Sequence, residues 1–184
     1  MPPSRNAISI GYFPKRIVPR PDWLKVSSVF DICSVSECMS SGPEDWINHW
    51  RHNDLWVYDT EEIAWSIVRD QSKTGVYAIP AYRMVPLLFD SGKAEVLDIP
   101  PLSVQELSAD FQFLGFDVVS RSQGANFECS PLSCNGVAET EPVNAHCLVD
   151  DEETALRLAL TFSSGAIGCE PGPYRVLEVW RRQK

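Results

Sequence analysis

A block of nine residues that occurs twice constrains the fold more than any other feature of this chain. Residues 56–64 read Trp-Val-Tyr-Asp-Thr-Glu-Glu-Ile-Ala, and residues 147–155 read Cys-Leu-Val-Asp-Asp-Glu-Glu-Thr-Ala. The two copies lie 91 positions apart and share an Asp, both Glu residues and the final Ala. Each is an apolar run followed by an acidic helix start, which predicts a strand leading into a capped helix.

Four further similarities flank this block and occur in the same order in both parts of the chain. Asn53 and Asn144 keep the offset of 91. The other pairs are Gly11-Tyr12 with Gly115-Phe116, Cys-Ser-x-x-x-Cys at 33–38 and 129–134, and Tyr-Arg at 82–83 and 174–175. Capping chemistry alone repeats Asp-Glu-Glu by chance, but it does not explain several collinear blocks. The sequence therefore predicts an internal duplication.

We expect an α+β fold made of two tandem related half-units packed with pseudo-two-fold symmetry. The first half-unit is residues 1–90, a connector with a short helix covers 91–113, and the second half-unit is 114–184. Each would run strand, Cys loop, strand, capped helix, strand. A unit of about 75–90 residues has a marginal core, so the two would gain stability by packing together.

The local patterns assign most of the chain to short elements. Alternating or continuous apolar runs predict strands at 8–13, 26–35, 55–58, 76–89, 116–120, 147–149 and 174–180. Caps and apolar stripes predict helices at 43–53, from Asp59 or Thr60 to 73, at 103–113, and from Asp150 or Asp151 to 162. The helix at 43–53 carries Trp46 and Trp50, which suits either core packing or a partner surface.

Charge narrows the functional classes. The chain has 16 basic and 25 acidic side chains, a formal net charge of −9, which argues against a general nucleic-acid binder. It is compatible with a basic protein partner. No apolar run approaches the ~20 residues that cross a bilayer, and residues 1–20 lack the apolar core of an export signal. We therefore expect a cytoplasmic protein with reduced cysteines and no membrane partner.

The repeated Cys motifs predict one possible metal site. Cys33, Cys38, Cys129 and Cys134 form two equivalent pairs, and four thiolates are a common zinc ligand set. Their spacing is wider than a tight Cys-x-x-Cys knuckle, so buried structural thiols are the competing explanation. A disulfide within each motif is a third alternative, which a reducing compartment disfavours.

Catalytic signatures are sparse, and the sequence leaves open whether the protein is an enzyme. Cys129 or Cys134 with His146 is the only local nucleophile–base pair, and His146 and Cys147 would point to opposite faces of a strand. We expect a cytosolic acidic interaction protein, an inhibitor or accessory factor of a basic protein partner. The alternative is an enzyme or a zinc- or thiol-based sensor, with its site between the halves around the two Cys loops and His146.

Overall fold

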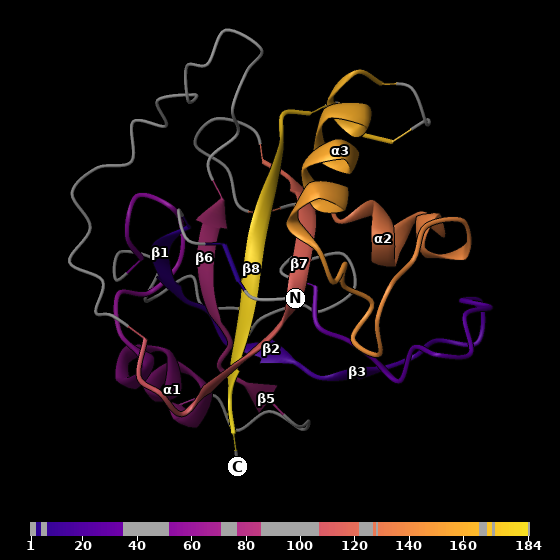
Figure 1. Cartoon of the computed structure of the whole chain (residues 1–184). Helices are drawn as coiled ribbons and strands as arrows, with labels where there is room; N and C mark the ends of the chain where they lie inside the picture. Colours follow the sequence, from indigo (N-terminus) through magenta and orange to yellow (C-terminus); the bar gives the residue numbers. More distant parts are fainter. Residues whose placement is uncertain are drawn as a thin grey trace, which may run out of the picture.

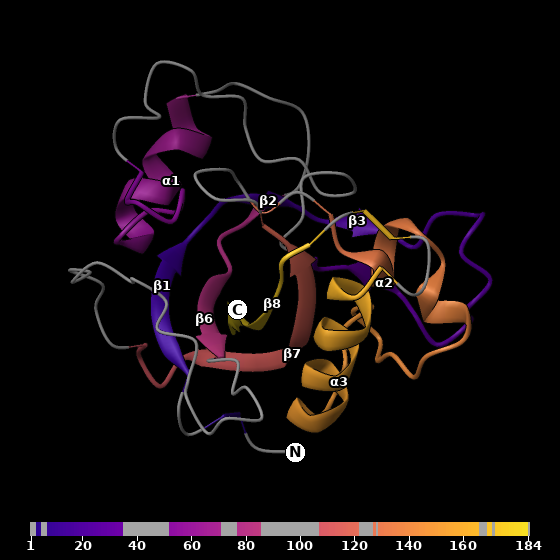
Figure 2. The same cartoon turned by 90° about the horizontal axis from the view of Figure 1, so that it is seen from above.

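The computed structural model describes residues 3–4, 7–34, 52–70, 77–85, 107–121, 127, 129–165, 169–170 and 172–183. The fold mixes helices with antiparallel sheets, as the α+β prediction requires. The main sheet has the strand order β1-β6-β8-β7 (Figures 1 and 2). Its strands are β1 (Ile8–Tyr12), β6 (Ala81–Val85), β7 (Phe111–Ser120) and β8 (Tyr174–Arg182).

Two small ribbons extend this framework. One pairs β2 (Lys15–Arg16) with β5 (Tyr77–Ala78), and the other pairs β3 (Val18–Pro19) with β4 (Asp31–Ile32). The helices are α1 (Glu61–Asp70), α2 (Pro131–Cys134), a 3₁₀ turn (Val137–Glu139) and α3 (Glu152–Ser163). In the part of the chain that is described, none of these helices has the length and apolarity needed to cross a bilayer.

The central strands β6 and β8 join the two parts of the chain into one sheet. They pair antiparallel from Ala81 opposite Trp180 to Val85 opposite Val176. Residues 81–85 precede the connector predicted at 91–113, and β8 is the last strand, so the sheet is continuous across it. Strands from both parts of the chain thus belong to one four-stranded sheet rather than to two separate sheets packed face to face.

Both long helices cover the same face of the sheet, and Figure 2 shows them outside its curve. Apolar side chains of α3 pack against β7 and β8, and those of α1 pack against β1, β6 and Phe111. The opposite face buries Leu177 and Val179 of β8, one position out of phase with Val176, as the alternation of a strand requires. The side chains of Leu55, Val57 and Leu148 close this second core.

Segments 55–58 and 147–149, which the apolar pattern predicted to be strands, are turns that each end in one β-bridge. Tyr58 bridges to Tyr12, and Val149 bridges to Phe116. An asparagine side chain organises each turn. The Asn144 side-chain oxygen accepts from the backbone of His146 and Leu148, and its amide donates to the Leu114 carbonyl and to Asp150. The prediction was wrong because apolar residues in a buried turn have the same pattern as a short strand.

Asn53 makes the corresponding contacts in the first turn. Its side-chain oxygen accepts from the backbone of Leu55 and Val57, and its amide donates to Ile10 and Asp59. Trp56 and Cys147 occupy the matching positions with φ values of 61° and 59°. The two turns therefore have the same hydrogen-bond pattern and the same left-handed residue.

Other sequence predictions meet mixed outcomes. The strand expected at 26–35 is reduced to Asp31–Ile32, because residues 26–30 make turns. Phe111–Phe113, expected to end a helix, belong to β7. The helix predicted at 43–53 lies outside the described residues, apart from 52–53, and so does the part of the predicted 91–113 connector before residue 107. The capped helices occur where expected, and Asp151 is the cap of α3, since it accepts from Thr154 N.

Candidate functional site

The site is built where strand β4 lies against the second asparagine turn. Phe30 N and Asp31 N donate to the Ala145 carbonyl, and Cys33 N donates to that of His146. These bonds fix residues 30–33 beside His146, whose own backbone N–H is held by Asn144. Two segments that are more than a hundred positions apart are thereby placed side by side.

Three potential metal ligands converge at this junction. His146 Nδ1 lies 2.5 Å from Asp31 Oδ1, the Cys33 thiol donates to the same Oδ1 at 3.4 Å, and Cys33 Sγ lies 3.9 Å from His146 Nδ1. All three ligand atoms lie within 4.8 Å of one another. The Asp31 and His146 side chains are 20% and 24% exposed, so solvent reaches one side of the group.

Arg181, from the end of β8, adds a positive charge to this cluster. Its Nη1 atom lies 3.8 Å from Asp31 Oδ2 and 3.9 Å from Cys33 Sγ. Burial tends to raise the pKa of Asp31, but hydrogen bonds from His146 and Cys33 and the charges of His146 and Arg181 leave it below its ordinary value. Asp31 is therefore a carboxylate over the whole neutral range, available to a cation.

The same geometry argues against a cysteine nucleophile at Cys33. Burial, followed by the negative charge of Asp31, raises the pKa of this thiol far above its ordinary value. A Cys–His–Asp relay also needs the two partners on different ring nitrogens, and here Cys33 and Asp31 both face Nδ1. A cation bound beside Cys33 would favour its thiolate form.

A buried aspartate links the two Cys-Ser motifs. Ser34 of the first motif donates to Asp117 Oδ2 at 3.0 Å, and Ser130 of the second donates to Asp117 Oδ1 at 2.6 Å. Asp117 is fully buried on β7. Ser34 and Ser130, which occupy matching positions in the repeated motifs, are thus brought together on one side chain.

Nearby, the buried Tyr82 hydroxyl has no hydrogen-bond partner among the described residues. Burial raises the pKa of Tyr82, and the charges of Asp117 and Cys33 raise it further, so the phenol lies within electrostatic range of both. The Tyr82 hydroxyl is therefore a buried polar group near Cys33 whose hydrogen bonding is not satisfied by the described residues.

The predicted metal ligands have different surroundings. Cys33 belongs to the cluster, and Cys38 lies outside the described residues. Cys129 is buried and Cys134 half-buried, and neither joins a group of three potential ligands in the described segments. The four-thiol set therefore stays a prediction.

The surroundings of His146 differ from the pairing with Cys129 or Cys134 that the sequence suggests. The described contacts of the His146 ring are with Asp31 and Cys33, not with Cys129 or Cys134. His52 is half-buried against the rings of Phe13 and Tyr58. The Cys147 thiol is buried and donates to the Leu132 carbonyl, and burial raises its pKa to about 12, which suits a structural role.

Sequence reasoning missed Asp31 and Arg181. Asp31 lies two positions before Cys33 in a strand-like segment, and that spacing places both side chains on one side. An Asp-x-Cys pattern was thus a usable signal. Arg181 carries no such signal, because no neighbouring residue in the sequence indicates a partner, whereas in the structure β8 continues to Arg182 and places Arg181 beside Cys33.

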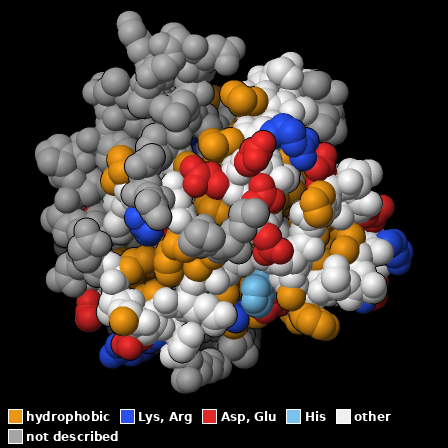
Figure 3. Space-filling view, in the orientation of Figure 1, with side chains coloured by type: hydrophobic (Ala, Val, Ile, Leu, Met, Phe, Trp, Pro, Cys, Tyr) orange, Lys and Arg blue, Asp and Glu red, His pale blue; other side chains and the backbone are white. Residues whose placement is uncertain are grey.

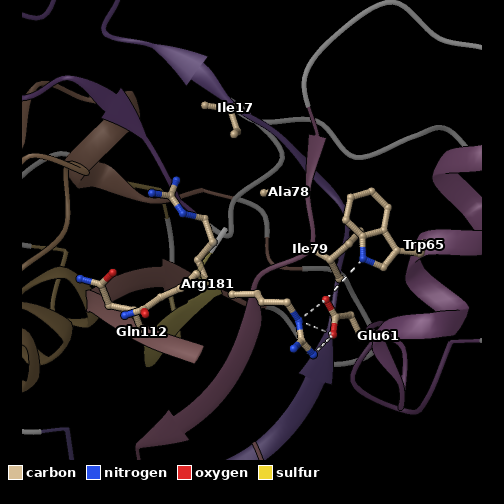
Figure 4. A pocket seen from close by; sticks show the side chains of 9 residues that line it. Ile17, Glu61, Trp65, Ala78, Ile79, Gln112 and Arg181 are labelled. Carbon is tan, nitrogen blue, oxygen red and sulfur yellow. Dashed lines mark hydrogen bonds and ion pairs between the residues drawn. The ribbon is translucent and has the colours of Figure 1, made fainter. Parts of the chain in front are cut away.

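A cavity of about 690 Å³ opens beside Arg181. Figure 4 shows its lining from three sides: β8 and β7, the β2–β5 region, and helix α1. A second cavity of about 20 Å³, large enough for one water molecule, is lined by Cys33 and shares Ile17, Ala78 and Arg181 with the first. Arg181 thus stands between the large cavity and the Cys33 cluster.

No protein-family model, curated protein or solved structure gives a significant match to this chain.

Proposed function

We propose that this protein binds one zinc ion through Asp31, Cys33 and His146. The observation that carries the proposal is the convergence of a carboxylate oxygen, a thiol and an imidazole nitrogen within 4.8 Å. These are the three ligand types that zinc takes from proteins. They come from two segments held together by backbone hydrogen bonds, so the ligands are largely preorganised.

The distances between the three ligand atoms suit a tetrahedral zinc ion once the hydrogen bond between Asp31 and His146 lengthens. Ligand bonds of 2.0–2.3 Å place the ligand atoms roughly 3.3–3.6 Å apart. The pairs involving Cys33 are at 3.4 and 3.9 Å, and only the 2.5 Å hydrogen bond between Asp31 and His146 has to open. A cation that replaces the shared proton would produce that opening.

Three protein ligands leave the fourth position of a tetrahedral ion for water or an external ligand, as in catalytic and ligand-binding zinc sites. With Asp31 and Cys33 both anionic, the ion and its ligands would be formally neutral, and Arg181 would add one positive charge. This supports the enzyme or zinc-sensor alternative of the sequence analysis more than a closed structural site.

Zinc stoichiometry tests the proposal. Equilibrium dialysis of the full chain against zinc should give one tight site, lost in Cys33→Ser and in His146→Ala. Cys129→Ser is the matched control and should retain zinc. Equal loss in Cys129→Ser would favour the four-thiol set instead, and no tight site in the wild-type chain would overturn both.

We also propose that the chain arose by internal duplication, with pseudo-two-fold symmetry about an axis between β6 and β8. The equivalent turns at Asn53 and Asn144 support it. So do Gly11 and Gly115, which have φ values of 131° and 146° and lie at the register shifts of β1 and β7. A crystal structure in which residues 8–12, 53–70 and 81–85 fail to superpose on their counterparts would refute it.

An interaction with a basic protein in the cytoplasm is a second candidate function. Phe30 and Trp23 are 74% and 44% exposed in the connection between β3 and β4, which extends away from the sheet in Figure 1. Acidic side chains gather on the face shown in Figure 3, and the net charge of −9 favours a basic partner.

The interaction is tested by quantitative recovery of partners from the native host. A stoichiometric basic protein should be recovered by the wild type and lost with Trp23→Ser/Phe30→Ser. It should be retained with Leu160→Ser, which removes an exposed apolar side chain from α3 instead. Equal recovery of the partner by both variants would contradict a binding surface at Trp23 and Phe30.

A further inference from the structure

We propose that the cavity beside Arg181 binds a small organic acid, with the carboxylate on Arg181 and the hydrocarbon part against Trp65 and Ile79. The proposal deepens the zinc proposal and rests on it in one respect: a second carboxylate oxygen would occupy the open position of the ion. Recognition by Arg181 does not itself require the metal.

The size and composition of the cavity fit such a molecule. Its volume of about 690 Å³ is within the usual 300–1,000 Å³ of small-molecule sites. Apolar side chains form one part of the lining, namely Ile17, Trp65, Ala78 and Ile79. The polar remainder consists of Glu61, Gln112, Arg181, Arg182 and Gln183. A few polar groups set in an apolar wall are what orients a bound organic molecule.

The charged side chains of the cavity lining favour an anionic ligand. Two arginines and one glutamate give the lining a formal charge of +1, in a chain whose formal net charge is −9. Arg182 is paired with Glu61 and Asp110, so Arg181 is the positive charge that the lining offers to an anion. An anionic ligand gains from this charge, whereas a neutral analogue of the same shape does not.

Arg182 is already committed to other side chains. It donates to both oxygens of Glu61, one of these bonds being 2.5 Å, and to Asp110 at 2.8 Å. Glu61 also accepts from the Trp65 indole at 3.3 Å. This network, drawn with dashed lines at Glu61 in Figure 4, holds Trp65 at the wall of the cavity.

Arg181 is different. Its contacts with Asp31 and Cys33 are long, at 3.8 and 3.9 Å, and its side chain is 31% exposed. A guanidinium has five N–H donors in a planar fork that matches a carboxylate. In the described structure Arg181 therefore has donor capacity to offer an oxyanion, and Figure 4 shows its guanidinium apart from the Glu61 network.

The water-sized cavity adjoins both Arg181 and the Cys33 cluster. It is lined by both Arg181 and Cys33, and Arg181 Nη1 lies 3.9 Å from Cys33 Sγ, so an oxyanion on Arg181 would lie near a metal bound by Cys33. One oxygen would accept from Arg181, while the other would complete the coordination of zinc. The protein would then bind its acid more tightly when zinc is present.

The test uses 3-phenylpropionate as the probe, with 3-phenylpropanamide as its neutral match and inorganic phosphate as an oxyanion without an apolar body. Isothermal titration of the zinc-loaded full chain should show binding of the acid and little of the amide or of phosphate. Arg181→Gln should lower the affinity for 3-phenylpropionate by about tenfold or more, because it removes a charge-assisted pair. Arg157→Gln, which removes an exposed arginine of α3, is the matched control and should leave binding unchanged.

Repeating the titration on metal-free protein separates the two proposals. Weaker but Arg181-dependent binding without zinc supports both. Arg181-dependent binding in a chain that takes up no zinc supports the acid site alone and refutes the zinc proposal. Equal affinity of acid and amide, or no effect of Arg181→Gln, overturns the acid site whatever the zinc content.

Discussion

His146 Nδ1 lies 2.5 Å from Asp31 Oδ1, although the two residues are 115 positions apart. Backbone hydrogen bonds from residues 30–33 to Ala145 and His146 create this contact, and the asparagine turn fixes the His146 side of it. The segment that carries Cys33 and the turn that carries His146 therefore form one structural unit.

Replacing Asp31 should change how stability depends on pH. The folded-state pKa of Asp31 lies below its ordinary value. Its contribution is therefore present above the unfolded pKa of about 3.9 and is lost as pH falls through the folded pKa. In metal-free protein, urea unfolding should show Asp31→Asn less stable than wild type at pH 7, with the difference shrinking below about pH 4.

Asp22→Asn, at an exposed carboxylate of the same connection, serves as the control and should follow the wild-type profile. A stability difference for Asp31→Asn that stayed constant down to strong acid would mean that the Asp31 charge does not stabilise the cluster.

Gly115→Ala should be among the most damaging small substitutions. A Cβ at Gly115 would lie 2.8 Å from Leu148 Cβ and 2.8 Å from Asn144 Nδ2, at a φ of +146°. Overpacking and backbone strain together should cost about 3 kcal/mol or more. At Gly136, with a φ of +70° and open space around it, alanine should cost only about 1–2 kcal/mol. Chemical denaturation measures the loss of stability in both variants. Equal losses would contradict the close approach of Leu148 and Asn144 to Gly115.

Asn144 should position His146 for metal binding as well as stabilise its turn. Asn144→Ala removes four hydrogen bonds and should cost about 2–4 kcal/mol. It should also lower the affinity for zinc by about tenfold or more, as the loss of hydrogen bonds that orient the ligands does at other metal sites. Competition with a chromophoric chelator under folding conditions measures the affinity.

Asn53→Ala is the matched control, because Asn53 makes the same four kinds of contact in the other turn. It should lower stability similarly and leave zinc affinity unchanged. Equal weakening of zinc by both variants would show that Asn144 acts through global stability alone.

Local patterns predicted much of the secondary structure for identifiable reasons. Helix α3 has an acidic first turn and a side-chain cap at Asp151, and α1 has the same acidic start with Thr60 accepting from Ile63 N. Strands β1, β6 and β8 follow apolar runs with turn signals around them. Such signals lie within a few residues of one another, where propensity and periodicity act.

The site depends on contacts that local patterns do not contain. The turns at Asn53 and Asn144 were predicted as strands, because their apolar residues are buried in the second core. Cys33 is one of the four predicted ligands, but its neighbours Asp31 and His146 meet only through the pairing of distant segments. The repeated thiols also point to Cys129, whereas in the structure the second motif meets the first through Ser130 and Asp117.

Cobalt(II) titration of the full chain tests the central claim most directly, because the spectrum reports both geometry and ligand type. The account predicts one equivalent of tetrahedral cobalt with a thiolate-to-cobalt charge-transfer band. That band should disappear in Cys33→Ser and persist in Cys38→Ser, Cys129→Ser and Cys134→Ser. A band that persists in Cys33→Ser, or a wild-type chain that gives only the spectrum of octahedral aqueous cobalt, would contradict a metal site at Asp31, Cys33 and His146.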